Sequence, residues 1–380
     1  MHSLCLENEY IKTQEQLDAY IQLIKESPIL AIDTEFMRRR TLYPELALIQ
    51  VFDGKHLALI DPCCELDLTQ FWNILKDTSI LKVLHSPSED LEVFMKHGDC
   101  IPAPLFDTQF AMTLLGFGNS VGFAMMVNKL LCQEIDKSES RTNWLQRPLT
   151  QKQLDYAAGD VIFLLPCFEI VKKLIDEKEW LDIVLSESAL MAKKRQYQIP
   201  DENLYLEIKN AWQLNSSDLG VLKKLAIWRR EKAKMKNLAL GFILKEHNMI
   251  EIAKYKPNSL TALRKLPGIE AMEVNKSGKE ILACISDAGS LLPEQNPEKI
   301  IRLVDFPSYK NEVKLLKQKI DGIAKLNDIP IEALSSKKQI NQLISWSWKY
   351  EKDQKKNKLI PDLLSCWRYK LLKGKIKEWE

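Results

Sequence analysis

The chain has 380 residues, of which 46% are hydrophobic and 28% are charged, and its formal net charge is +2. This length indicates two or three domains, the composition is that of an ordinary water-soluble protein, and no apolar run is long enough to span a bilayer. The eight cysteines include no C-x-x-C motif and the N-terminal segment lacks the pattern of a signal peptide, which argues against a zinc site or a disulfide framework and predicts a reducing, cytoplasmic location.

The first predicted strand ends in two acids. Residues 14–26 are expected to form a helix with Thr13 as its N-cap, and the apolar run that begins at Ile29 leads into Asp33 and Glu35. A short apolar run predicts a buried strand, on which side chains two residues apart share a face. Two carboxylates that project together need a cation, and oxygen ligands suit Mg²⁺ or Mn²⁺. The alternative is that both acids simply end the strand in solvent.

The chain then continues as a meander and as strands that alternate with helices. A basic loop precedes a strand at 46–52, and the Asp53-Gly54 turn returns the chain as a strand at 56–60. The elements expected next are a helix at 67–76, a strand at 80–85, a helix around Asp90, a helix capped by Asp107 and a helix at 120–133. Together these elements predict a mixed α/β sheet.

A further helix is predicted from Thr150 and Gln153, which have the spacing of a capping box. This helix carries Tyr156 and Asp160, which are four residues apart and therefore lie on the same face. With the two acids of the first strand and Asp90, Asp160 completes a set of four carboxylates.

The rear of the chain, after residue 166, differs from the front in charge and in predicted secondary structure. The first 166 residues hold 14 basic and 23 acidic residues, so that the remainder is basic. After a helical connector at 168–203, helical spacing and lysine dominate. A basic rear half predicts contact with a polyanion, and a solvated lysine-rich surface is the alternative. The segment 233–240 is similar to 324–331, an offset of 91 residues, which indicates a duplicated helical domain.

The acidic motifs, in this order on an α/β sheet, resemble the DEDD exonuclease superfamily, in the subclass whose third motif is Y-x-x-x-D. Asp33-Thr34-Glu35 matches the first motif, the segment 85–90 matches the second, and the segment 156–160 matches the third. Further segments, including 43–44, 48–50 and 147–149, are similar to the ribonuclease D family. Ser86-Pro87-Ser88 departs from the family pattern beside the second-motif aspartate.

The resemblance implies the fold class and the domain boundaries. An α/β ribonuclease H-like exonuclease domain, with a mixed sheet flanked by helices, is expected at 1–167, before the helical connector. Two all-α domains that resemble the HRDC module are expected at 204–290 and 294–380, the second more diverged than the first.

The resemblance also implies the activity. It is that of a 3′-5′ exoribonuclease that hydrolyses terminal phosphodiesters with two divalent metal ions, Mg²⁺ or Mn²⁺, and releases nucleoside 5′-monophosphates. The implied partner is RNA, including tRNA precursors and other small structured RNAs. The expected metal ligands are Asp33, Glu35, Asp90 and Asp160. Because a phenol with a pKa of about 10 is a poor base at neutral pH, Tyr156 is expected to aim a metal-bound water instead.

Candidate substrate contacts lie near the motifs and in the rear half. Gln50 is a candidate contact to the terminal nucleotide, and one of Lys137, Arg141 and Arg147 is expected to contact backbone phosphates. Lys223, Arg230 and Lys234 form one stripe of a predicted helix that could follow a phosphate backbone. The loop at 38–40 could contact phosphates or be solvated, and His85, Asp107 and Trp228 have structural roles as their simplest interpretation.

Two other functions stay open. One is a DNA 3′-5′ exonuclease of repair or proofreading type, although no polymerase or helicase segment accompanies the motifs. The other is a non-catalytic nucleic-acid adaptor, which would have no need of a complete acid set. A monomer without a membrane partner is expected.

Overall fold

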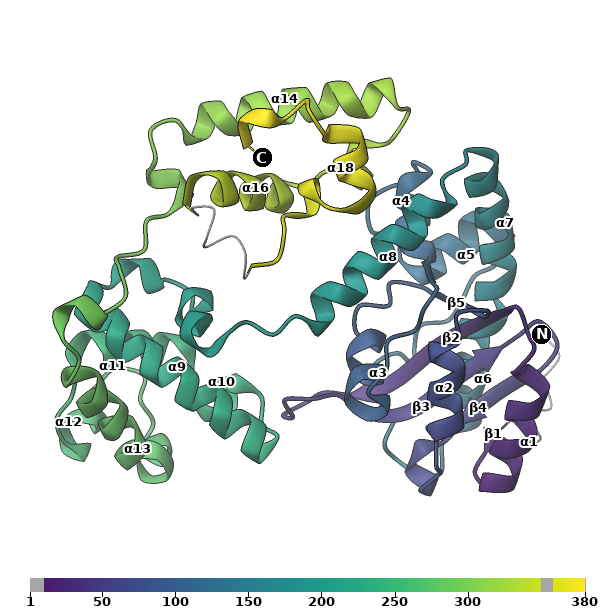
Figure 1. Ribbon diagram of the computed structural model, residues 1–380. Helices are drawn as coiled ribbons and strands as arrows, with labels where there is room; N and C mark the ends of the chain where they lie inside the picture. Colours follow the sequence, from purple (N-terminus) through teal and green to yellow (C-terminus); the bar gives the residue numbers. More distant parts are fainter. Residues whose placement is uncertain (1–9, 350–357, 380) are drawn as a thin grey trace. The chain divides into compact units, whose positions relative to one another are not determined.

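The computed structural model describes residues 10–349 and 358–379 (Figure 1). The chain divides into two compact units. The first unit comprises residues 1–37, 44–197 and 308–380, and the second comprises residues 38–43 and 198–307. Within the described residues, every helix is too short or too polar to cross a membrane.

A six-stranded mixed sheet lies at the centre of the first unit, in the order β1-β4-β3-β2-β5-β6. Its strands are β1 (Tyr10–Ile11), β2 (Ile29–Met37), β3 (Glu45–Phe52), β4 (Leu57–Ile60), β5 (Leu81–Leu84) and β6 (Leu105–Asp107). Strands β2, β3 and β4 form the predicted antiparallel meander, while β5 and β6 extend the sheet in parallel beside β2 and β1 pairs in parallel with β4. The sequence did not predict β1 and β6, because two or three residues are too few to show an alternating pattern.

Helices cover both faces of this sheet (Figure 1). They are α1 (Gln14–Ile24), α2 (Thr69–Lys76), α3 (Asp90–Gly98), α4 (Thr108–Leu114), α5 (Phe123–Leu131), α6 (Gln151–Ile162), α7 (Leu164–Glu177) and α8 (Leu181–Gln196). On β2, Leu30 and Ile32 join a buried core with side chains of α1, α2 and α3. Because side chains alternate along a strand, Asp33 and Glu35 point to the opposite face, where α6 contacts β2, β3 and β4.

The predicted helix caps determine where three of these helices begin. Thr13 completes a capping box at α1, and Thr150 completes one with Gln153 at α6. Asp107 caps α4, because its Oδ1 accepts a hydrogen bond from the backbone N–H of Gln109 at 2.9 Å. Such caps satisfy backbone N–H groups that have no partner within the helix. At α6 the cap fixes the start of the helix that carries the third motif.

The rear half is entirely helical in its described residues. The second unit contains α9 (Ser216–Lys236), α10 (Leu240–Ile243), α11 (Glu246–Tyr255), α12 (Leu260–Arg264) and α13 (Ala271–Gly289). Residues 308–380 contain α14 (Tyr309–Leu326), α15 (Ile331–Leu334), α16 (Lys337–Lys349) and α18 (Cys366–Leu372). Helices α10 and α15 begin at residues 240 and 331, and α11 and α16 begin at residues 246 and 337. Both intervals equal the offset of 91 residues in the sequence, which supports the predicted duplication.

The second helical domain, residues 308–380, packs onto the sheet-containing part of the first unit. Arg368 of α18 is 3% exposed and pairs with Glu187 of α8, whose carboxylate also accepts a 2.9 Å hydrogen bond from Trp367 Nε1. Lys194 of α8 forms an ion pair of 2.7 Å with Asp362. This domain is therefore a structural part of the first unit, and α8 connects it to the sheet.

Candidate active site

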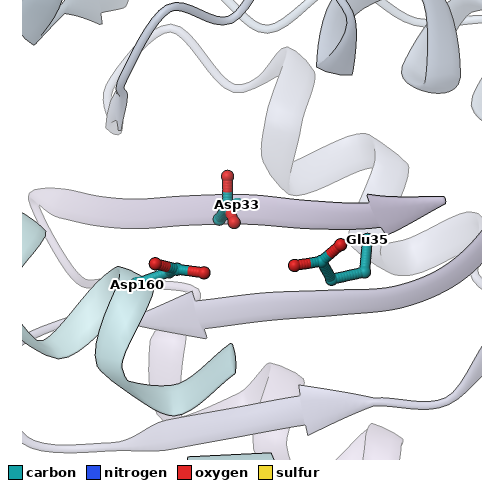
Figure 2. Close-up of side chains that lie close together, drawn as sticks. All are labelled: Asp33, Glu35 and Asp160. Atoms are coloured by element: carbon teal, nitrogen blue, oxygen red, sulfur yellow. The ribbon is translucent and has the colours of Figure 1, made fainter. Parts of the chain in front are cut away.

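Three carboxylates converge at the end of β2. Asp33 and Glu35 from the strand and Asp160 from α6 each offer an oxygen, and these three oxygens lie within 4.8 Å of one another. Figure 2 shows the two strand residues and the helix residue facing one another. The register of β2 against β3 shifts between Glu35 and Phe36, directly after the acids, and the pairing then continues to Met37. These three residues are called the acid cluster below.

Asp90 reaches the site from the other side of β2. Strand β5 pairs with β2 only as far as Ala31, and beyond that point α3 contacts β2 with Asp90 as its first residue. The Oδ1 atom of Asp90 accepts a hydrogen bond from the hydroxyl of Thr34, whose side chain alternates with those of Asp33 and Glu35. Asp90 lies outside the acid cluster, yet its charge raises the pKa of both strand acids. Three of the four predicted acids thus form the acid cluster, and the fourth, Asp90, lies next to it.

Burial raises the pKa of all four carboxyls, and at Asp33 and Glu35 the charges of the neighbouring acids raise it further. Burial is the largest cause, and it raises the pKa of Glu35 to about 9, that of Asp160 to about 7 and that of Asp90 to about 6. Burial and the charges of the other three acids raise the pKa of Asp33 well above its usual range. Four such groups can all be ionised at neutral pH only beside compensating positive charge. A set of oxygen donors without nitrogen or sulfur ligands therefore fits divalent ions such as Mg²⁺ or Mn²⁺.

Tyr156 lies one turn before Asp160 on α6 and hydrogen-bonds its carboxylate. Burial, followed by the charges of the acid cluster, raises the pKa of Tyr156 far above its ordinary value. The indole ring of Trp144 packs beside the phenol, with the ring centroids 6.0 Å apart. Tyr156 therefore keeps its proton at neutral pH and acts as a hydrogen-bond donor.

A cavity of about 220 Å³ opens onto Asp33, Tyr156 and Asp160. Its wall includes His85 and Phe123, whose rings pack edge to face with centroids 5.6 Å apart. Burial lowers the pKa of His85 to about 4, and its two ring nitrogens lie 2.9 Å from a threonine hydroxyl and 3.0 Å from a backbone carbonyl. His85 is thus a neutral, hydrogen-bonded wall residue, as its simplest interpretation predicted.

The loop before Asp90 is held by hydrogen bonds despite its departure from the family pattern. The backbone N–H of Ser86, at a φ of 59°, donates to Asp107 Oδ1 at 3.0 Å. The hydroxyl of Ser88 accepts a hydrogen bond of 3.0 Å from Arg195 Nε of α8. These contacts hold the loop directly before the beginning of α3, where Asp90 lies.

The three basic candidates near the third motif have different positions. Lys137 is exposed and lines the cavity, and Arg141 is exposed. Arg147 instead forms two hydrogen bonds of 2.6 Å with the buried Asp61 and donates to the backbone carbonyls of Ala47 and of residues 144 and 146. The prediction that Arg147 contacts substrate phosphates is therefore wrong, because its guanidinium is occupied by structural partners.

The three basic residues predicted to form a stripe on α9 also have different surroundings. Lys234 is exposed and Lys223 is half-buried on α9. Arg230 pairs with Asp201 and donates to a backbone carbonyl ahead of the helix, so its predicted substrate role is corrected to a structural one. Trp228 packs against the buried core of the second unit, as predicted.

Gln50 and Thr34 complete the surroundings of the acids. Gln50 pairs with Asp33 across β2 and β3, but it is 0% exposed, so its side chain is not accessible to a nucleotide in this structure. Thr34 was not predicted as a functional residue. The only sequence signal was its place between the two acids of the first motif, which says nothing about its partner Asp90.

Three family models match successive parts of the chain. The model described as 3′-5′ exonuclease matches residues 8–176, and the model described as HRDC domain matches residues 218–285. A model described as ribonuclease D, C-terminal HRDC domain, matches residues 307–376. The predicted fold class, a mixed sheet flanked by helices followed by HRDC domains, is therefore confirmed.

Curated relatives named ribonuclease D match nearly the whole chain. The protein of Escherichia coli is 42% identical, and the match covers 96% of this chain and 96% of the relative. The protein of Haemophilus influenzae is 40% identical, with 91% of this chain and 86% of the relative covered.

Solved structures agree with this match. The crystal structure of Escherichia coli RNase D, an exoribonuclease involved in structured RNA processing, has a TM-score of 0.90 at 40% identity and covers 96% of each chain. The catalytic core of RRP6 from Trypanosoma brucei has a TM-score of 0.60 at 22% identity, with 74% of this chain and 80% of that chain covered, which shows a shared fold.

Proposed function

This chain belongs to the ribonuclease D family of 3′-5′ exoribonucleases, and we propose that it shortens structured RNAs, tRNA precursors with 3′ extensions among them, by releasing nucleoside 5′-monophosphates. The observation that carries this function is the acid cluster, whose three oxygens lie within 4.8 Å of one another beside a cavity of about 220 Å³. A cytoplasmic location and a monomeric state stay predictions.

Two divalent ions, Mg²⁺ or Mn²⁺, would be held by the four acids. When bound, such ions supply a nucleophilic water at neutral pH and neutralise charge on the attacking and leaving oxygens. Glu35 and Asp160 would hold the ion on the side of the nucleophile, and Asp90 would hold the ion on the side of the leaving group. Asp33, whose pKa is raised by the charges of all three other acids, is suited to serve both.

Tyr156 would orient the attacking water. Its hydroxyl stays protonated and donates to Asp160, so its oxygen can accept a hydrogen bond from a water that lies beside the same carboxylate. A base role does not suit a group whose pKa is raised so far. The wall of His85 and Phe123 would exclude water from the side of the cavity where the terminal nucleoside would lie.

Exposed basic residues would hold the rest of the RNA. Lys137 lines the cavity and Arg141 is exposed in the loop that follows, so both are suited to phosphates close to the 3′ end. Lys223 and Lys234 on α9 would contact phosphates farther along the strand. Such contacts would supply affinity that falls as salt rises.

A direct test incubates the full chain and Mg²⁺ with a tRNA transcript that carries a 3′ extension. We expect shortening by single nucleotides, nucleoside 5′-monophosphates as products, and no reaction with a chelator. Asp33→Asn and Asp160→Asn should abolish cleavage while the circular dichroism spectrum stays that of the wild type. Faster degradation of a matched DNA overhang would favour the DNA exonuclease, and no nucleotide release with either Mg²⁺ or Mn²⁺ would favour the adaptor.

A further inference from the structure

Gln50 has a buried amide without a hydrogen-bond partner. The residue lies in the middle of β3 and is 0% exposed. Both Oε1 and Nε2 of its side chain are buried, and neither has a hydrogen-bond partner among the described residues. A primary amide offers two N–H donors and a carbonyl acceptor, and burying them unpaired is unfavourable. We therefore expect the amide of Gln50 to have a polar partner close by.

The sheet register places Asp33 next to this amide. Gln50 is the direct cross-strand partner of Asp33 on β2 and of Leu59 on β4. Residues directly opposite in an antiparallel pair point to the same face, with their Cβ atoms about 4.5–5.5 Å apart. Of these two neighbours Leu59 is apolar and Asp33 is the acid. The amide of Gln50 thus lies on the face that carries the acid cluster.

Burial excludes the simpler role of touching the substrate. The cavity is bordered by Asp33, Tyr156 and Asp160, and Gln50 is not among the residues that line it. Helix α6 covers β3 on this face, and its buried residues include Ala157 and Ala158. Gln50 is therefore placed behind Asp33, away from the opening through which a nucleotide would enter.

We propose that Gln50 is a positioning residue for the metal site. An N–H of its amide donates to one buried water, which in turn donates to the carboxylate of Asp33 and thereby holds that carboxylate toward the ions. This role rests on the proposed metal-dependent function. A metal-bound carboxylate oxygen still has a free lone pair, and hydrogen bonds to metal ligands orient them and raise metal affinity by about 10–100-fold.

The test measures metal binding without RNA. Gln50→Met keeps the size of the side chain and removes the amide. We expect isothermal titration of the full chain with Mn²⁺ to give binding about tenfold weaker than that of the wild type. A control is Asn248→Leu, because Asn248 is also 0% exposed and its amide nitrogen already has partners in Gly268 and Glu273, both in the second unit. This control should unfold at a lower temperature and bind Mn²⁺ with unchanged affinity.

The outcomes separate the role of Gln50 from the function of the site. If wild type binds Mn²⁺, Asp33→Asn does not, and Gln50→Met binds within twofold of wild type, Gln50 has no positioning role. If wild type itself binds no Mn²⁺, the proposed function fails first. Gln50→Leu serves as a second variant where the methionine variant does not fold. A lower unfolding temperature with unchanged Mn²⁺ affinity in the variant that folds would assign Gln50 to the core alone.

Discussion

Thr34 donates its hydroxyl to the carboxylate of Asp90, and this hydrogen bond joins the strand of the first motif to the helix of the second. The two residues are 56 positions apart in the chain, and both are buried. Asp90 is thereby held beside the acid cluster, although it is not one of the three residues whose oxygens lie within 4.8 Å.

Replacing Thr34 by valine should therefore lower activity through Asp90. The variant keeps the shape of the side chain and leaves a buried acceptor without its donor, a loss of about 1–3 kcal/mol. We expect a lower unfolding temperature and a lower kcat in steady-state cleavage of a short RNA. Thr113→Val is the matched control, because Thr113 is equally buried but donates to a backbone carbonyl within α4. If both variants keep the wild-type kcat, the Thr34–Asp90 bond does not position the acid.

Tyr156→Phe should reduce turnover more than substrate binding. The phenol is protonated and bonded to Asp160, so its removal should take away orientation of the attacking water and lower kcat by about 10²-fold. Steady-state kinetics with a short RNA, together with Mn²⁺ titration, separates this loss from a loss of metal. Tyr20→Phe is the control, since Tyr20 is buried and its hydroxyl donates to the carbonyl of Val51 at 3.2 Å, away from the acids. An unchanged kcat for Tyr156→Phe would remove the residue from the mechanism.

The metal-free protein should lose stability as pH rises. The folded-state pKa values of Asp90, Asp160 and Glu35, about 6, 7 and 9, lie above their ordinary values of 3.8 and 4.5. The folded state then binds more protons than the unfolded state, so this contribution to stability is complete below about pH 4 and is lost progressively up to about pH 9. Thermal unfolding in chelator at pH 5 to 9 should show a falling midpoint for this reason.

Mg²⁺ should reverse most of that loss at pH 8, because it compensates the ionised carboxylates and binds only the folded state. Asp160→Asn removes one of the raised groups and should flatten the dependence in chelator. A midpoint in chelator that is the same at pH 6 and pH 8 in the wild type would contradict the raised pKa values.

The same substitution should lower stability at Arg147 and weaken RNA binding at Lys137. Arg147→Met leaves the carboxylate of the buried Asp61 without its cationic partner, which is expected to cost about 3–5 kcal/mol of unfolding free energy. Lys137→Met should leave stability unchanged and weaken RNA binding, because the side chain is exposed at the cavity. Urea unfolding and filter binding measure the two effects. Weaker RNA binding by a fully folded Arg147→Met protein would restore the original interpretation of that residue.

The double variant Lys223→Gln, Lys234→Gln should bind long RNA more weakly and with less dependence on salt. If each lysine meets one phosphate, the slope of log K against log salt should fall by about 1 to 2. Arg230→Gln is the comparison, since that side chain pairs with Asp201 and should affect stability instead. An unchanged salt slope in the double variant would show that this part of α9 is not an RNA contact.

Much of the fold could be predicted because its signals are local. The two-residue spacing of Asp33 and Glu35 on a strand fixes a shared face, and the four-residue spacing of Tyr156 and Asp160 on a helix does the same. The caps at Thr13, Asp107 and Thr150 were predictable for the same reason, since each acts within its own first turn.

Partners that are far apart in the chain were decided by the tertiary structure. The sequence shows that Arg147 is basic, but only the packing of the loop against Asp61 shows that its charge faces a buried carboxylate and not solvent. The same holds for Thr34 with Asp90, for Gln50 with Asp33, and for the attachment of the second helical domain through Arg368 and Glu187. Residue type and periodicity fix the face on which a side chain lies, whereas the group that it meets depends on how distant elements pack.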